Sequence, residues 1–195
     1  MKTSIKTSPQ ERKLGFRILF LAMFAIGTGQ TLFIAVLPPY ARGLGLSEVQ
    51  VGFIFSLSAL GWMVMSPFWG KKSDFIGRKS IIILGLVVYA LATILMGIEF
   101  RLNELGYINL TTLFGLLILT RGCYGFLGSG AHSASMAYVA DRTTEKERSG
   151  VMAVMGSAFA ISGIVGPGLA SVAVLLGPLV PYFLFGGIKI KRGVV

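Results

Sequence analysis

Residues 18–41 read ILFLAMFAIGTGQTLFIAVLPPYA, a stretch of 24 residues without one charged side chain. About 20 mostly apolar residues in a helix cross the roughly 30 Å of hydrocarbon in a bilayer. The stretch is too long for the core of a secretory signal, and no small-x-small cleavage site leads from it into a soluble region. The sequence therefore predicts a first membrane span at residues 16–41.

The same pattern recurs along the chain, at residues 51–69, 80–98, 113–140 and 150–176. Residues 178–188 are apolar too, but at about 1.5 Å per residue they reach only half-way across a bilayer. The chain of 195 residues is 54% hydrophobic and 13% charged, about half the charged fraction of a soluble domain. We therefore expect an all-α integral membrane protein, a multi-span bundle over residues 16–188 with about five full helices and an incomplete sixth. A cytoplasmic tail (1–15) and a basic tail (189–195) would flank it.

Basic residues concentrate in alternate connections. Twelve Lys and Arg lie before the first span, between the second and third, and between the fourth and fifth, whereas the other connections hold only Arg42 and Arg101. Cytoplasmic loops carry the excess of Lys and Arg, so the N-terminus is predicted to lie in the cytoplasm, with the spans in the cell membrane. The net charge of +10 therefore reflects contact with the lipid bilayer. We expect no nucleic acid, because no aromatic residues interleave with the basic ones.

The sequence contains few residues of the types that form catalytic or metal-binding sites. One cysteine excludes a disulfide framework and a four-cysteine zinc site. Eight acidic residues and one histidine leave few groups for a metal or hydrolytic centre, and the chain has no nucleophile–base pair or phosphate-binding glycine loop. We expect no catalytic residue, no metal and no cofactor.

Four polar residues inside the spans are candidates for a transport pathway. Arg121 is costly within a membrane, so it faces a cavity or a partner unless buried carbonyls satisfy it or it reaches outward. His132 follows close to three turns later, about 16 Å away on the same helical face with Gly125 between, and could exchange a proton or simply pack. Gln30 and Thr31 offer neutral hydrogen bonds to a substrate or to a neighbouring helix. No Asp or Glu lies well inside a span, since Glu99 is near the outer end of the third.

Two spans carry strips of small residues at steps of three and four. Helices in lipid associate through close packing, so each strip lets another backbone approach. The partner is either within this bundle or a helix that the chain does not contain. Pro167 also removes a backbone donor and should bend its span. The strips are Gly52, Ser56, Ala59, Met63, Ser66 and Gly70 in the second span, and Gly156, Ala160, Gly163, Pro167 and Ala170 in the fifth.

Three motifs together resemble the major facilitator superfamily. The connection GKKSDFIGRK at residues 70–79 resembles its loop motif G-x-L-x-D-R-x-G-R-K, with Lys72 for the leucine and Phe75 for a basic residue. RGCYGFLG at 121–128 resembles the arginine motif of its fourth helix, and GIVGP at 163–167 is similar to the glycine-proline motif of its antiporters. The resemblance covers about residues 17–185. Its matching residues are Gly70, Asp74, Gly77, Arg78 and Lys79 in the loop, Arg121 in the fourth span, and Gly163, Gly166 and Pro167 in the fifth.

The resemblance implies two halves of six helices that rock about a central substrate site. Asp74 would cap a helix of the other half and Arg78 would pair with Asp141, which would hold the outward-facing route closed. Both contacts are physically sound, because carboxylates favour helix N-termini and guanidinium pairs well with carboxylate. The alternative is that Arg78 and Lys79 only orient the helices.

The implied activity is the efflux of a small organic solute in exchange for protons. A complete member has twelve spans, so we expect a truncated half that is inactive alone and whose partner is the missing six-helix half. Two alternatives stay open. The chain could be a membrane subunit that binds another protein through its small-residue strips, or a half-transporter that works as two copies.

Overall fold

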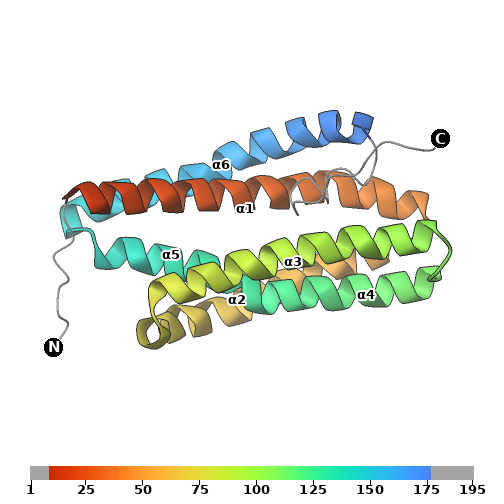
Figure 1. The fold of residues 1–195 in the computed structure, drawn as a ribbon, viewed down its shortest axis with the longest axis horizontal. Helices are drawn as coiled ribbons and strands as arrows, with labels where there is room; N and C mark the ends of the chain where they lie inside the picture. The colour runs from red at the N-terminus through yellow and green to blue at the C-terminus, as the bar shows by residue number, and fades with distance from the viewer. Residues whose placement is uncertain (1–8, 177–195) are drawn as a thin grey trace.

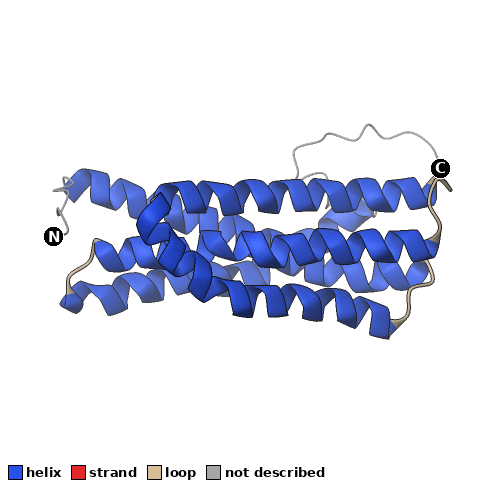
Figure 2. Ribbon diagram, turned by 90° about the horizontal axis from the view of Figure 1, so that it is seen from below, coloured by secondary structure: helices blue, strands red, loops and turns tan. Residues whose placement is uncertain are grey.

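The computed structural model describes residues 9–176, which form long helices joined by short connections. The helices run along one axis and the connections lie at its two ends (Figures 1 and 2). Five helical segments are long and apolar enough to cross a membrane, which confirms the predicted all-α, multi-span bundle. The elements are α1 (Pro9–Gly43), α2 (Glu48–Ile76), α3 (Arg78–Glu104), α4 (Leu110–Cys123), the π-helix η1 (Tyr124–Gly128), α5 (Ser129–Asp141) and α6 (Glu145–Leu176).

The helices extend beyond the apolar stretches that predicted them. α1 begins at Pro9, within the segment expected to be a tail, and proline is favoured in the first turn of a helix. α2 and α3 are separated by Gly77 alone, whose φ of +102° is a conformation that glycine adopts without strain. The predicted fourth span is the continuous segment Leu110–Asp141. The short apolar stretch at 178–188 and the basic tail at 189–195 lie outside the described residues.

Side-chain caps fix where two helices start at the end opposite Gly77. The Ser47 hydroxyl accepts from the backbone N–H of Gln50, and the Gln50 side chain accepts from the N–H of Ser47 at 2.8 Å. Asn109 accepts from the N–H of Thr112 at 2.8 Å. These bonds satisfy backbone donors that the first turn of a helix leaves unpaired, so α2 and α4 begin at defined residues.

The helices pack in two groups, α1 with α6 and α2 with α3, α4, η1 and α5 (Figure 1). The contact between α1 and α6 is close and partly polar. The hydroxyl of Thr31 donates to the carbonyl of Ser162 at 2.7 Å. At Gly166 an added Cβ would lie 2.9 Å from both Leu32 N and Thr28 O. A glycine is therefore required at position 166 for α6 to approach α1.

Two apolar clusters fill the two ends of the bundle. One cluster includes Leu37, Phe100 and Leu117, toward the end with the α1–α2 and α3–α4 connections. The other includes Ile82 and Val139, toward the end with Gly77. Polar and aromatic side chains lie at the level between them, and that level holds the candidate site.

Replacing Gly166 by alanine tests the close approach of α1 and α6. We expect Gly166→Ala to lower the free energy of unfolding by about 1–3 kcal/mol, because the added methyl overpacks the contact. Gly163→Ala is the matched control, since a Cβ there meets nothing within 4 Å and alanine favours the helix. Thermal unfolding in detergent measures the difference. Equal unfolding temperatures for the two variants would show that the contact between α1 and α6 accommodates a methyl group at position 166.

Candidate functional site

Arg121 lies in the last turn of α4 at the middle of the bundle, and only 6% of its surface is exposed. Its Nη1 donates to Oε1 of Gln30 on α1 at 3.2 Å. The guanidinium carbon lies 4.3 Å from the ring centre of Phe33 and 5.0 Å from that of Tyr124. Aromatic faces attract cations, and they do so more strongly where water is excluded. Arg121 therefore points inward, into a setting of one amide and several rings, and does not reach out to the surface.

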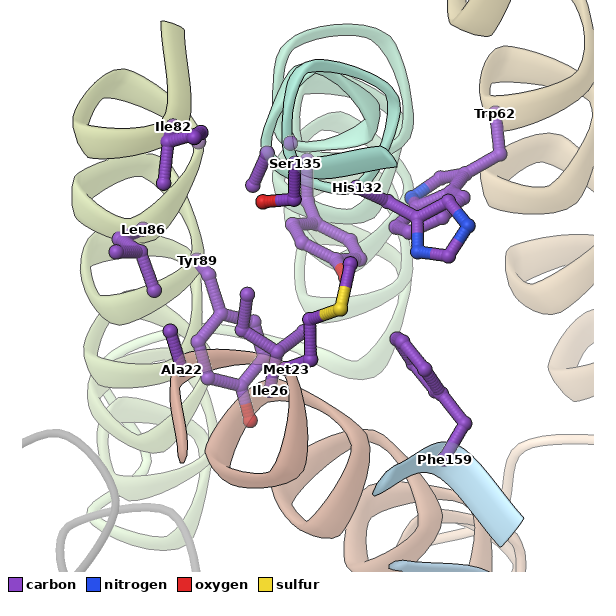
Figure 3. A pocket seen from close by; sticks show the side chains of 14 residues that line it. Ala22, Met23, Ile26, Trp62, Ile82, Leu86, Tyr89, His132, Ser135 and Phe159 are labelled. Atoms are coloured by element: carbon purple, nitrogen blue, oxygen red, sulfur yellow. The ribbon is translucent and has the colours of Figure 1, made fainter. Parts of the chain in front are cut away.

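Two small cavities adjoin this group. One is lined by Gln30 and Arg121, and the other extends toward the Gly77 end of the bundle. In the second cavity, Figure 3 shows side chains from α1, α2, α3, α5 and α6 around one space, with His132 among them. Tyr89 and Tyr124 line both cavities and so form their shared wall. Each cavity has room for about one water molecule, so the described bundle is closed to an organic solute at this level.

His132 packs between aromatic rings. Its ring centre lies 5.9 Å from that of Trp62 on α2 and 5.3 Å from that of Phe159 on α6. Within residues 9–176, its buried Nδ1 has no hydrogen-bonding partner. Packing of the imidazole is thus observed, and one ring nitrogen keeps its bonding capacity for water or a ligand.

The π-helical turn η1 changes which residues face the cavities. Helical spacing placed Gly125 between Arg121 and His132 on one face. The structure places Tyr124 there, whereas Gly125 lies against α2, where an added Cβ would be 2.9 Å from Ser58 Cα. A π-turn inserts a residue into the helical repeat, so regular spacing fails across it. The spacing argument was therefore wrong about Gly125 and missed Tyr124.

The same turn is held by a side chain from α2. The indole Nε1 of Trp69 donates to the carbonyl oxygen of Phe126 at 2.7 Å. A π-turn disturbs the regular backbone ladder, and a carbonyl freed in this way needs another donor inside a membrane. Trp69 and, at 3.4 Å, the hydroxyl of Ser129 both donate to the carbonyl of Phe126, and the bond from Trp69 ties the local geometry of η1 to the packing of α2.

Gln30 and Thr31 are adjacent but serve different contacts. Gln30 lines the Arg121 cavity and accepts from its guanidinium. Thr31 directs its hydroxyl to α6, beside Gly166. Of the two alternatives open for this pair, bonding to a neighbouring helix is observed for both residues, Gln30 with α4 and Thr31 with α6. Contact of Gln30 with a substrate stays a prediction.

At the Gly77 end, Arg78 joins α2, α3 and α5. Its Nε donates to Oδ2 of Asp141 at 3.1 Å, and its Nη1 donates to the carbonyl of Gly70 at 3.0 Å. Its Nη2 forms an ion pair with Asp74. The side chain of Arg78 is 16% exposed, while the two carboxylates are about half exposed. Lys79 next to it is exposed and has no ion pair to any residue in the range 9–176.

A second ion pair at this end was not predicted. Nη1 and Nη2 of Arg12 on α1 donate to the two carboxylate oxygens of Glu147 on α6, at 3.2 and 3.3 Å. Nη1 also lies 3.4 Å from the carbonyl of Arg142. Because 135 residues separate the pair, no local pattern pointed to it, and only the packing of α1 on α6 brings the two together.

Most of the small residues in the two strips face outward, but Ala170 is buried in an apolar cluster of the bundle. An added Cβ at Gly52, Gly156 or Gly163 would meet nothing within 4 Å. Ala59 and Ala160 are exposed as well. Within residues 9–176, nothing packs against Gly52, Gly156 or Gly163, so these positions remain open to a helix from elsewhere, whereas Ala170 packs inside the bundle.

Glu99 is more enclosed than its place near the end of the third span implied. It is 7% exposed and accepts a hydrogen bond from the hydroxyl of Thr120 on α4. Glu99 thus lies near the end of α3, as expected, but the neighbouring helices enclose its side chain. Charge pattern alone could not show this, because burial of the residue depends on how α3 packs against α4.

The length and apolar composition of the helices define a multi-pass membrane protein. The sequence profile of the Major Facilitator Superfamily matches residues 19–190. The chain belongs to the Major Facilitator Superfamily, a family of transporters, and is not an enzyme.

Two drug-resistance proteins show the extent of the likeness. The chain is 31% identical over 190 residues to multidrug resistance protein 2 of Bacillus subtilis, which covers 97% of this chain and 44% of that protein. It is 25% identical over 173 residues to quinolone resistance protein NorA of Staphylococcus aureus, which covers 89% of this chain and 42% of the relative. The chain thus spans less than half the length of these relatives.

A conservative change at Arg78 tests the charged cluster. Arg78→Lys keeps the charge but loses the planar fork that reaches Asp141, Asp74 and Gly70 at once. We expect a loss of about 1–2 kcal/mol in the free energy of unfolding, since the half-exposed carboxylates weaken the ion pairs. Lys79→Gln is the control and should leave stability unchanged. Unfolding in detergent at low and high salt measures both, and the deficit should shrink with salt. If Arg78→Lys is as stable as the parent chain, the guanidinium bonds of Arg78 do not stabilise the packing of α2, α3 and α5.

Proposed function

We propose that this chain is the N-terminal half of a drug-efflux facilitator, which exports a small organic solute in exchange for protons by alternating access. The observation that carries the proposal is the pair of open small-residue faces on α2 and α6, on a bundle whose polar centre is closed. A solute site between two halves needs such faces, because another helix must pack against each of them. The likeness to two drug-resistance proteins supports the class of solute.

The basic residues support a cytoplasmic location for the N-terminus and the Arg78 end. The cluster of Lys and Arg lies at this end, with Arg42 and Arg101 at the other. Such asymmetry orients multi-span proteins in the cell membrane. Arg121 and Gln30 then lie between the two membrane surfaces, as a solute pathway requires.

The aromatic walls support an aromatic or otherwise flat organic solute. Tyr89, Tyr124 and Trp62 surround the cavities, and rings bind flat solutes by stacking. Arg121 would leave its place over Phe33 when the centre opens, and its charge would attract an anionic group or bias a nearby proton site. His132 adds a nitrogen that can accept or donate at the same wall.

The charged cluster supports a role in conformational switching. Arg78 links Asp141 to Asp74, so α2, α3 and α5 move as one unit while the cluster is intact. Asp74 is half exposed and can still cap a helix N-terminus of a second half. Rocking would break that contact and leave the bonds of Arg78 in place. Gly70 is open to such a helix, since an added Cβ meets nothing within 4 Å.

Expression of the chain with a second half tests the proposal. The partner is the part of Bacillus subtilis multidrug resistance protein 2 that this chain does not match. In cells without their own efflux pumps, we expect ethidium efflux from the pair and none from either part alone. Arg121→Ala should abolish efflux from the pair, because it removes the buried charge at the centre. Arg101→Ala is the matched control, as this arginine is exposed and bonds to Glu104 at the bundle end.

The other outcomes separate the alternatives. Efflux from this chain alone, lost in Arg121→Ala, would contradict the half-protein proposal and identify a transporter made of two copies. Stable association with the second half without any efflux would favour a membrane subunit that moves nothing. Crosslinking after mild solubilisation reports which complex is present in each case.

A further inference from the structure

A second polar group is buried away from the Arg121 cavities, the carboxyl of Glu99 on α3. The residue is 7% exposed and lies in the chain between Met96 and Phe100, both members of the apolar cluster at this end. About 7 Å of helix separates it from Glu104, the last residue of α3. Glu99 lines neither of the two cavities around Arg121, so its burial is not part of the site already described.

The carboxyl has one hydrogen-bond donor for two oxygens. The hydroxyl of Thr120 donates to Oε1 of Glu99. Oε2 is buried and has no partner within residues 9–176, and no ion pair in that range includes the residue. An ionised carboxylate offers about four acceptor sites, and leaving most of them unmet in apolar surroundings strongly disfavours the charged form.

The charged and titratable groups on the packed helices have other partners. On α4, Arg121 donates to Gln30 of α1. On α3, Arg101 pairs with Glu104, which also accepts from the Tyr40 hydroxyl of α1. α2 carries no charged residue from position 51 to position 70. No described neighbour supplies Glu99 with a compensating positive charge.

We propose that Glu99 is a proton-binding site, with its carboxyl carried in the neutral form between α3 and α4. When this end of the bundle opens, the O–H bond breaks, the proton passes to water and the carboxylate becomes hydrated. Closure reverses the transfer. The neutral carboxylic acid still accepts the hydrogen bond from the Thr120 hydroxyl. The closed bundle can therefore form without burying a charged group between α3 and α4. Use of this proton in solute exchange rests on the proposed function, whereas protonation in the closed bundle does not.

Infrared spectroscopy of the full chain in phospholipid vesicles tests the protonation directly. At about pH 7 a glutamate in water is ionised, so a protonated carboxyl band reports an enclosed acid. We expect that band in the parent chain and its loss in Glu99→Gln. Glu104→Gln is the matched control on the same helix and should leave the band intact. No such band, or an unchanged band in a folded Glu99→Gln, would overturn the proposal.

A second variant covers the case in which Glu99→Gln fails to fold. Thr120→Val keeps the shape of the side chain but removes the donor to the carboxyl oxygen. We expect the band to remain and to move to higher frequency, because the carbonyl loses its hydrogen bond. A band whose position does not change in Thr120→Val would assign it to another acid and count against Glu99.

Transport measurements on the paired halves test the use of the proton separately. Glu99→Gln should retain exchange of ethidium down its own gradient and lose efflux driven by a proton gradient, because the amide cannot carry a proton. Proton-driven efflux equal to the parent would overturn the coupling role, even with the infrared band present. If the parent pair shows no efflux at all, the proposed function fails, and the infrared result still decides the protonation of Glu99.

Discussion

In the hydrocarbon of a bilayer, a polar group without a hydrogen-bonding partner inside the protein has no water molecule to bond to instead. This constraint organises the bundle at every level. The backbone satisfies it within helices, and the remaining polar side chains satisfy it between them. Arg121 bonds to Gln30, Thr31 bonds to the carbonyl of Ser162, and Trp69 bonds to the carbonyl of Phe126 in the π-turn. Each of these bonds joins two helical segments. The bonds therefore fix how the helices lie against one another, and with them which apolar side chains come into contact.

Close approach of helices is the second consequence. Apolar burial against a neighbour gains little in lipid, so contact depends on small residues. Gly166 brings α6 against α1, and Gly125 brings η1 against α2. Gly52 and Gly163 have the same chemistry but no neighbour within 4 Å. Glycine thus occurs both where helices touch inside the bundle and on helix faces that have no neighbour. The sequence does not distinguish these two kinds of position, whereas the structure does.

The centre and the ends of the bundle divide the functional roles. Arg121 and the aromatic cavities occupy the centre, closed to anything larger than about one water molecule. At one end, the bonds of Arg78 unite three helices, and the pair of Arg12 with Glu147 unites the other two. Toward the other end, Glu99 and Thr120 bury a carboxyl between α3 and α4. In the proposed alternation between two states, the bonds at the Arg78 end would stay in place, while the centre and the Glu99 end would open.

The sequence by itself determined the membrane class, the number of described spans, and the loop motif around Arg78. These follow from length, hydropathy and the spacing of residues close together in the chain, which local physics controls. It also pointed to Arg121 as a residue that faces a cavity or a partner, because an arginine is costly inside a span. The start of α1 at Pro9 was not predicted, since polar residues at a helix end leave no hydropathy signal.

The tertiary structure alone decided which polar residues meet. The π-turn shifts the register between Arg121 and His132, so Tyr124 faces the cavities where regular spacing placed Gly125. Gln30 and Thr31 differ by about 100° around α1, which sends one toward Arg121 and the other toward α6. Glu99 is buried because α4 lies beside α3, and nothing within α3 encodes that neighbour. Such contacts depend on the rotation and register of packed helices, which the order of residues along one helix does not specify.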